Sequence, residues 1–432
     1  MDEVTRGARA LVVCPDIRGQ SYDLDADERL AEAEGLARAI GVIIAHATIL
    51  PIRQVQPNTL FGSGQVENIG IWCEQHECEL VIVDGALSPI QQRNLEDRLK
   101  RKVIDRTGLI LEIFGERAAT AEGRLQVELA HLDYQQSRLV RSWTHLERQR
   151  GGYGFLGGPG ETQIEADRRM IRQRMSQLRK ELEQVRKTRA LHRARRGRAP
   201  WPVIALVGYT NAGKSTLFNG LTGSDVMAED LLFATLDPTM RAIELPGVEK
   251  AILSDTVGFI SDLPTQLVAA FRATLEEVTG ADVIVHVRDM ANPDAAAQKQ
   301  QVLQILTDLE VIDAESGVSE IPILEAWNKI DALAEERRAE LVEIASHDDK
   351  TVPISAMTGE GVEHLLQRID ALLTQDSRTY AIELAAGDGM RSAWLHQHGQ
   401  VIEEQSIDRD EGPVRQLSVR LTPKEFGRFS AL

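Results

Sequence analysis

The chain reads Val203-Ile-Ala-Leu-Val207-Gly-Tyr-Thr-Asn-Ala-Gly-Lys-Ser215, an apolar run that leads directly into a glycine-rich turn and a lysine. The apolar run predicts a buried strand, and the residues after Ser215 predict a helix. In this context the spacing G-x4-G-K-S is that of a P-loop, because its glycines let backbone N–H groups wrap around phosphate oxygens. Lys214 places a positive charge between the two terminal phosphates, and the Ser215 hydroxyl binds Mg²⁺. We therefore predict a P-loop NTPase fold of the α/β class, whose phosphate-binding residues are Gly208, Tyr209, Thr210, Asn211, Ala212, Gly213, Lys214, Ser215 and Thr216.

A second motif distinguishes the base. Residues 323–331 read Ile-Leu-Glu-Ala-Trp-Asn-Lys-Ile-Asp, an apolar strand that ends in N-K-x-D. A carboxylate at Asp331 can accept both the ring N–H and the exocyclic amino group of guanine, whereas adenine offers neither donor there. A further strand ends in a turn that matches the motif packing the base and presenting a backbone N–H to the guanine oxygen. GTP is favoured over ATP, and the predicted base-binding residues are Asn328, Lys329, Asp331, Ser355, Ala356 and Met357.

Two further segments predict the nucleotide switches. Residues 251–258 form a strand that delivers Asp255 to the magnesium shell, followed by Gly258, whose N–H can meet the γ-phosphate. Upstream, residues 232–239 predict the first switch loop, in which we choose Thr235 over Thr239 to bind Mg²⁺ together with Ser215. The predicted switch contacts are Phe233, Ala234, Thr235, Leu236, Asp237, Asp255, Thr256, Val257 and Gly258. Lys214, Asp255 and Gly258 are the predicted catalytic residues.

The residue after Gly258 is Phe259, where Ras-like enzymes carry a glutamine that orients the attacking water. We therefore expect slow intrinsic hydrolysis and an additional group that completes the site. This group is either supplied by a partner or is a monovalent cation, K⁺, bound partly by Asn211, which resembles the P-loop asparagine of potassium-assisted GTPases. Stabilisation of the loop is an equally good interpretation of Asn211.

The length of 432 residues predicts about three domains, at roughly 100–200 residues each. An N-terminal α/β domain of the βαβ type is expected at residues 1–120, a helical hairpin at 121–198, a GTP-binding domain at 199–375 and a small α+β domain at 376–432. In the first domain, Ser88 and Pro89 predict the start of a helix that continues over 91–102. The last domain reads as a β-α-β-β pattern over 379–384, 390–398, 401–407 and 414–421.

Charge is distributed unevenly along the chain. The net charge is −17, yet residues 138–198 hold 17 Lys and Arg against 6 Asp and Glu. Apolar residues form a seam on each side of residues 149–160, mostly at spacings of three and four, which predicts two helices folded back as an antiparallel hairpin. The first seam is Leu125, Leu129, Leu132, Leu139, Trp143 and Leu146, and the second is Ile164, Ile171, Met175, Leu178, Leu182 and Val185. The joining segment is rich in glycine and carries large apolar side chains. It is either a flexible turn or, as we favour, a loop that contacts unpaired RNA bases through Arg150, Tyr153, Phe155 and Leu156.

Composition excludes several other classes of protein. Cys14, Cys73 and Cys78 lack paired ligand spacing, so we expect buried thiols rather than disulfides or a zinc site. The sequence has no run of about 18 apolar residues and no apolar leader at its start, so we expect a cytoplasmic protein that needs no membrane.

Two segments resemble the HflX family of ribosome-associated GTPases: Gly154-Phe-Leu-Gly-Gly-Pro-Gly-Glu-Thr-Gln163 and Gly208-Tyr-Thr-Asn-Ala-Gly-Lys-Ser-Thr-Leu-Phe-Asn219. The resemblance covers nearly the whole chain. It implies a protein that binds the large ribosomal subunit, extends its hairpin loop toward the peptidyl-transferase region, and separates stalled ribosomes under stress in a GTP-dependent manner. Lys and Arg contacts to rRNA phosphates would suit the basic hairpin.

Two other functions would account for parts of the sequence. The hairpin could be a coiled coil that dimerises or binds protein effectors, which would make the chain a regulatory switch; we expect a monomer. An RNA-modifying enzyme is disfavoured because no catalytic cysteine or metal cluster stands out.

Overall fold

The computed structural model describes residues 6–149, 159–196, 201–224, 233, 239–248, 250–261, 275, 277–375, 378–385, 387–409, 412–421, 423–430 and 432. The chain forms two compact units. The first comprises Met1–Lys187, Glu229–Asp237 and Val257–Thr274, and the second comprises Thr188–Ala228, Pro238–Thr256 and Leu275–Leu432. Each contains a parallel or largely parallel sheet with helices, so the predicted multidomain α/β class is confirmed.

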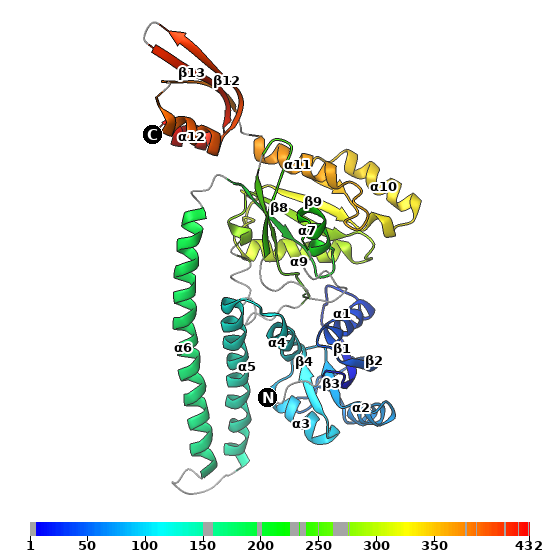
Figure 1. The fold of residues 1–432 in the computed structure, drawn as a ribbon. Helices are drawn as coiled ribbons and strands as arrows, with labels where there is room; N and C mark the ends of the chain where they lie inside the picture. Colours follow the sequence, from blue (N-terminus) through cyan, green and yellow to red (C-terminus); the bar gives the residue numbers. More distant parts are fainter. Residues whose placement is uncertain are drawn as a thin grey trace. The chain divides into compact units, whose positions relative to one another are not determined.

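A parallel sheet of order β2-β1-β3-β4 forms the centre of the first unit (Figure 1). Its strands are nearly continuous apolar runs, as expected of parallel strands covered on both faces; Leu11, Val81 and Val103 are at most 1% exposed. The strands are β1 (Arg9–Ile17), β2 (Ile43–Ile52), β3 (Leu80–Val83) and β4 (Lys102–Asp105), and the helices are α1 (Ala26–Ala39), α2 (Ser63–Gln75), α3 (Pro89–Leu99) and α4 (Arg106–Arg117).

Helix α3 begins where the sequence predicts and ends earlier. The Ser88 hydroxyl accepts a hydrogen bond from the backbone N–H of Gln91, and Pro89 occupies the first turn. The predicted continuation to Lys102 is wrong. Lys100 takes a left-handed conformation with φ 52°, which ends the helix, and β4 already starts at Lys102.

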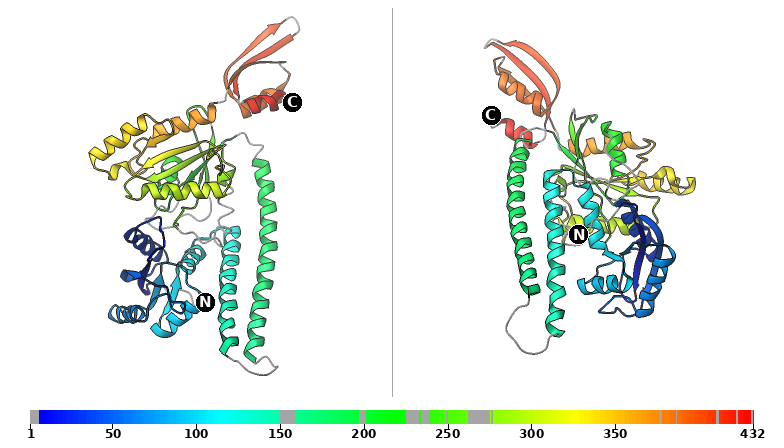
Figure 2. Two further views of the ribbon diagram at one scale, coloured as in Figure 1. Left: turned by 180° about the vertical axis from the view of Figure 1, so that it is seen from behind. Right: turned by 60° about the horizontal axis from the view of Figure 1, so that its bottom comes forward.

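Helices α5 (Ala121–Gln149) and α6 (Pro159–Arg196) lie side by side as an antiparallel pair (Figures 1 and 2). Arg174 of α6 pairs with Glu128 of α5, with Nε 2.7 Å from Oε1. On α6 the buried side chains are those of the predicted seam, Met175, Leu178 and Leu182. On α5 the seam leucines whose side chains are described, Leu125, Leu129 and Leu132, are half-buried, and the buried positions include Val127, Ala130 and Tyr134. The difference arises because α5 also packs against α3 and α4 of the same unit.

The second unit contains a six-stranded sheet of order β10-β9-β8-β5-β7-β6, parallel except for β6. Leu217 of α7 and Leu365 of α11 pack on the face that carries Leu324, whereas Glu325 points to the other face and pairs with Lys299 of α9. Helices therefore cover both faces. The strands are β5 (Val203–Val207), β6 (Thr239–Ile243), β7 (Ala251–Asp255), β8 (Val283–Asp289), β9 (Ile323–Asn328) and β10 (Thr351–Pro353), and the helices are α7 (Lys214–Thr222), α9 (Ala295–Asp308), α10 (Glu335–Ser346) and α11 (Val362–Thr374).

The C-terminal part of the second unit is an antiparallel sheet of order β11-β13-β12, with β11 (Arg378–Ala385), β12 (Gln400–Arg409) and β13 (Gly412–Leu421). Helix α12 (Gly389–His398) falls at the predicted place. A second helix, α13 (Pro423–Ser430), was not predicted. Its Phe429 is buried and its Phe426 stacks on Tyr380, with ring centroids 3.9 Å apart.

Candidate functional site

The glycine-rich loop leaves the end of β5 in the middle of the six-stranded sheet, where parallel α/β sheets commonly bind ligands. Gly208 and Gly213 have φ values of 153° and 92°, and a Cβ on either would lie 2.2 Å from a neighbouring atom. For Gly208 this atom is the carbonyl oxygen of Val287 in β8, and for Gly213 it is Nδ2 of Asn328. Both glycines of the motif are therefore required by packing as well as by backbone conformation.

Lys214 is the first residue of α7 and its side chain is buried. Its ammonium donates to the carbonyl oxygens of Gly208, at 3.1 Å, and Tyr209, at 2.8 Å. Burial lowers the pKa of Lys214 to about 8, an effect that the negative charge of Asp255 partly opposes. The ammonium is thus held inside the loop that is predicted to surround the phosphates.

Ser215 and Asp255 lie together at the ends of adjacent elements. The Ser215 hydroxyl donates to Oδ2 of Asp255 at 2.8 Å, and Asp255 is fully buried at the end of β7. The next residue, Thr256, donates its hydroxyl to the carbonyl oxygen of Leu206 at 2.6 Å, which fixes the end of β7 against β5. A hydroxyl and a carboxylate are the oxygen ligands that Mg²⁺ prefers, so these residues fit the predicted magnesium site.

Asn328 joins three predicted motifs. Its side chain is buried, its amide N–H donates to the carbonyl oxygen of Ala212 at 2.8 Å, and its amide oxygen accepts from the backbone N–H of Ala356 at 2.8 Å. The P-loop, the N-K-x-D segment and the Ser355 turn are therefore held together by one side chain. Sequence reasoning treated Asn328 as a base contact and missed this bridging contact.

The remaining residues predicted to bind the base lie on the segments that Asn328 joins. Asp331 is exposed in a short 3-10 helix (Ile330–Ala332), and Met357 is 80% exposed. Lys329 has a left-handed backbone with φ 64°, and its ammonium lies 2.8 Å from Oδ2 of Asp289 at the end of β8. Ser355 is fully buried, and its hydroxyl accepts from the N–H of Thr358. Asp289 was not predicted, because it follows an apolar strand without any recognisable motif.

The switch segments are described only in part. Phe233 is buried with φ 59°, and its ring meets that of Phe114 edge-on at 5.0 Å. Val257 and Gly258 are buried in the segment that follows β7. Ala234, Thr235, Leu236 and Asp237 lie outside the described residues, as do the hairpin-loop residues Arg150, Tyr153, Phe155 and Leu156.

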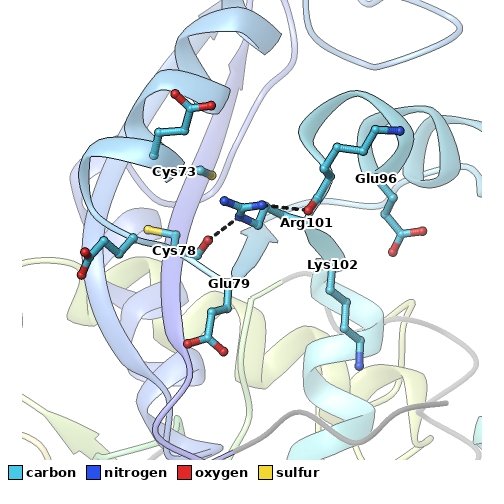
Figure 3. A pocket seen from close by; sticks show the side chains of 9 residues that line it. Cys73, Cys78, Glu79, Glu96, Arg101 and Lys102 are labelled. Carbon is cyan, nitrogen blue, oxygen red and sulfur yellow. Dashed lines mark hydrogen bonds between the residues drawn. The ribbon is translucent and has the colours of Figure 1, made fainter.

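A cavity of about 640 Å³ opens elsewhere, in the first unit, and is lined by residues that include Cys73, Cys78, Glu79, Arg101 and Lys102 (Figure 3). Arg101 closes part of its wall by donating from Nε to the carbonyl oxygen of Cys78 at 2.8 Å. The cavity lies at the amino ends of β3 and β4, opposite the carboxyl ends at which parallel sheets usually bind ligands. It therefore does not extend the predicted site.

The three cysteines lie in the interior of the first unit. All three cysteines are buried and free, and burial raises the pKa of Cys73 to about 11. Across the residues that the structure describes, no three His, Cys, Asp or Glu side chains cluster as a metal site would require. Within those residues, no helix is both long enough and apolar enough to cross a membrane.

Comparison with known proteins decides the family. A GTPase HflX of Magnetococcus marinus is 50% identical to this chain over 406 residues, which cover 94% of the chain and 91% of that protein. A GTPase HflX of Escherichia coli K12 is 44% identical over 402 residues, covering 93% and 92%. The chain belongs to the GTPase HflX family. The resemblance found in the sequence is confirmed, and GTP hydrolysis is the activity of this HflX protein.

Family models match successive parts of this HflX chain. They are described as GTP-binding GTPase N-terminal (residues 27–115), GTP-binding GTPase middle region (117–196), 50S ribosome-binding GTPase (203–329) and HflX C-terminal domain (340–429). Among solved structures, that of SsGBP in complex with GDP is 27% identical, with a TM-score of 0.50, and the match covers 85% of this chain and 99% of that one.

Proposed function

We propose that this GTPase binds the large ribosomal subunit through its helical hairpin and separates stalled ribosomes into subunits while GTP is bound. The exposed cations of α6 carry the proposal. Arg169, Arg172, Arg179 and Lys180 are exposed, while the apolar seam of the same helix is buried. A basic face directed at solvent suits rRNA phosphates, because binding releases their counterions.

The rival proposal, a coiled coil that dimerises, is less well supported. Dimerisation through the α6 seam needs that seam to be available to a second chain. Met175, Leu178 and Leu182 are instead buried within a single chain, where α6 lies beside α5. Over residues 165–182, where the α6 side chains are described, the exposed positions are mainly polar or charged, with Met170 as an apolar exception.

In the proposed reaction, Lys214 stabilises negative charge on the phosphates, Ser215 and Thr235 would hold Mg²⁺, which would neutralise phosphate charge, and Asp255 would anchor its water shell. Gly258 contacts the γ-phosphate through its N–H, and Asp331 selects guanine. We also propose that intrinsic hydrolysis is slow and that the ribosome, or a K⁺ bound partly by Asn211, completes the site. The backbone of Asn211, with φ 59°, turns the loop at this position.

Co-sedimentation with purified large subunits tests the proposal, with a non-hydrolysable GTP analogue compared with GDP across a salt series. We expect binding to be stronger with the analogue and to weaken as salt rises. Replacing Arg169 and Arg172 by Glu should weaken binding roughly tenfold or more and make its salt dependence shallower. A matched variant with Arg93 and Arg98 of α3 replaced by Glu serves as the control and should bind normally; both residues are exposed.

Equal binding by the two double variants would show that the hairpin is not part of the interface with the large subunit. Absence of binding by the wild-type protein in either nucleotide state would favour a switch that acts on protein effectors.

A further inference from the structure

Ser261, three residues after Gly258, is held on every polar atom by two side chains of the N-terminal domain. Glu32 accepts from the backbone N–H of Ser261 at 3.2 Å and also from its hydroxyl. Arg106 donates from one terminal nitrogen to the carbonyl oxygen of Ser261 at 2.8 Å and to its hydroxyl oxygen at 3.1 Å. The segment Val257–Thr274 accordingly belongs to the same compact unit as residues 1–187.

The two side chains that hold Ser261 are themselves fixed. Arg106 and Glu32 are each 7% exposed, and they form an ion pair at 2.8 Å. The other terminal nitrogen of Arg106 pairs with Asp84, which is 5% exposed. Burial alone would lower the pKa of Arg106, but the carboxylates of Asp84 and Glu32 outweigh it and raise the pKa, so the guanidinium stays charged. Both terminal nitrogens of Arg106 are thus paired inside a buried charge cluster, which tolerates little displacement.

Helix α4 meets the first switch segment as well. Phe114, in the last part of α4, is 1% exposed and contacts the ring of Phe233, which is 2% exposed, edge-on at 5.0 Å. Phe233 lies in Glu229–Asp237, the other short segment that joins the first unit. One helix thus contacts both switch segments, with Arg106 in its first turn and Phe114 near its end.

The residue before Arg106 holds the hairpin. Asp105 is 2% exposed and caps α4 by accepting from the N–H of Gly108 at 2.9 Å. Its carboxylate also accepts from the hydroxyl of Tyr134 and from a guanidinium nitrogen of Arg138, each at 2.6 Å. Both of these residues belong to α5. Two consecutive residues therefore face two different partners, the switch segment and the hairpin.

We propose that the first turn of α4 couples the GTPase switches to the hairpin, with Arg106 and Glu32 as positioning residues for the segment behind Gly258 and Asp105 as the anchor of α5. Displacement of Ser261 must move Arg106, and through the adjacent peptide unit it must change the hydrogen bonds of Asp105. Paired groups of this kind couple two sites only if both sites shift the equilibrium between two arrangements of these groups. Whether the switch segment and α5 do so can be measured. The proposal rests on GTP hydrolysis and is independent of the hairpin's partner.

Hydrogen exchange of the full-length protein tests this coupling, with GDP compared with a non-hydrolysable GTP analogue. In the wild type, we expect amides of α5 around Tyr134 to exchange at different rates in the two states. Replacing Tyr134 by Phe and Arg138 by Gln removes the hydroxyl and the guanidinium that donate from α5 to Asp105, while the bond from the Gly108 N–H remains. In that variant the difference at α5 should be lost, while the difference at residues 251–261 remains.

The other end of the relay is tested by Ser261→Ala and Glu32→Gln, both nearly isosteric. Each should diminish the nucleotide-dependent difference at α5, since the backbone contacts of residue 261 remain. Glu32→Gln should also speed exchange of the amides around Ser261 by about tenfold, because a hydrogen bond to a charged group is weakened. Tyr380→Phe in the C-terminal domain is the matched control and should behave as wild type.

Two results would overturn the proposal. One is equal exchange of α5 in both nucleotide states of the wild type. The other is a wild-type difference that persists when Tyr134 and Arg138 are replaced. A cooperative thermal transition close to that of the wild type establishes that each variant is folded. Ser261→Ala leaves the N-terminal domain unchanged, so this variant still tests the proposal if the α5 variant unfolds.

Discussion

At the scale of single residues, Lys214 predicts a pH dependence of nucleotide binding. Burial lowers its pKa to about 8, so above this pH the nucleotide-free protein carries a neutral amine, whereas bound phosphates favour the ammonium. Binding of GDP should therefore take up a proton, and affinity should fall as pH rises from about 7 to 9, by up to about tenfold per unit above the pKa.

Calorimetry in buffers of different ionisation enthalpy measures this proton uptake. We expect nearly one proton per GDP at about pH 9 and far less at about pH 7. Lys214→Met should bind weakly and without this pH dependence, whereas Lys329→Met should retain it. Uptake that is equal at both pH values would show that Lys214 is already charged in the free protein.

Asp331 predicts base specificity. Replacing its carboxylate by the amide of Asn removes an acceptor for guanine N–H groups and adds a donor that suits the second carbonyl of xanthine. Asp331→Asn should lower GTP affinity by about a hundredfold or more and admit xanthosine nucleotides, measured by competition with a fluorescent GDP. Asp308→Asn, at the exposed last residue of α9, is the control. Unchanged GTP affinity without any gain for xanthosine nucleotides would refute the assignment.

Site residues could be predicted from the sequence where they belong to a recognisable motif, but contacts between residues far apart in the sequence could not. The order of the P-loop, N-K-x-D and Ser355 motifs predicted one site. Asn328, in the N-K-x-D motif, forms hydrogen bonds to both of the other motifs. The contacts of Ser261 with Arg106 and Glu32 span 155 and 229 positions. Neither side chain lies in a recognisable motif, so only the folded chain reveals their pairing.

At the scale of elements, local signals predicted where helices start better than where they end or whether they exist. The Ser88–Pro89 cap placed the start of α3, but the left-handed turn at Lys100 has no distinctive residue. Helix α13 was missed although Pro423 occupies its first position, which is typical of helix starts. It is short, and its burial against Tyr380 depends on a strand far back in the chain.

The α6 seam carries a stability prediction at this scale. Leu178 is fully buried, so Leu178→Ala should lower the free energy of unfolding of the first unit by about 2–5 kcal/mol. Gln177→Ala, at the neighbouring exposed position, should change it by less than about 0.5 kcal/mol. Denaturant unfolding at several protein concentrations measures both. A midpoint that rises with concentration would indicate that the seam pairs between chains, contrary to the intramolecular hairpin.

At the scale of the whole molecule, the chain is acidic except for one basic region. The net charge of −17 opposes general binding to nucleic acid, while the cations concentrated in residues 138–198 supply one region suited to it. Composition alone would have argued against an RNA partner, and only the distribution along the chain reversed that interpretation. Hydrolysis motifs and the basic hairpin lie in different parts of the sequence, so we expect GTP hydrolysis and the proposed ribosome binding to be separable by mutation.

Replacement of Tyr153, Phe155 and Leu156 by Ser tests this separation without shortening the chain. Because these side chains lie far from the nucleotide motifs in the sequence, GTP and GDP affinities should stay within about twofold of wild type. Stimulation of GTP hydrolysis by ribosomes and separation of their subunits should fall by about tenfold or more, since stacking on each unpaired base contributes roughly 1–3 kcal/mol. Steady-state hydrolysis with and without ribosomes, together with sedimentation of subunits, measures both. If stimulation and separation persist, the segment is only a turn, and ribosome contact must come from the exposed cations of α6.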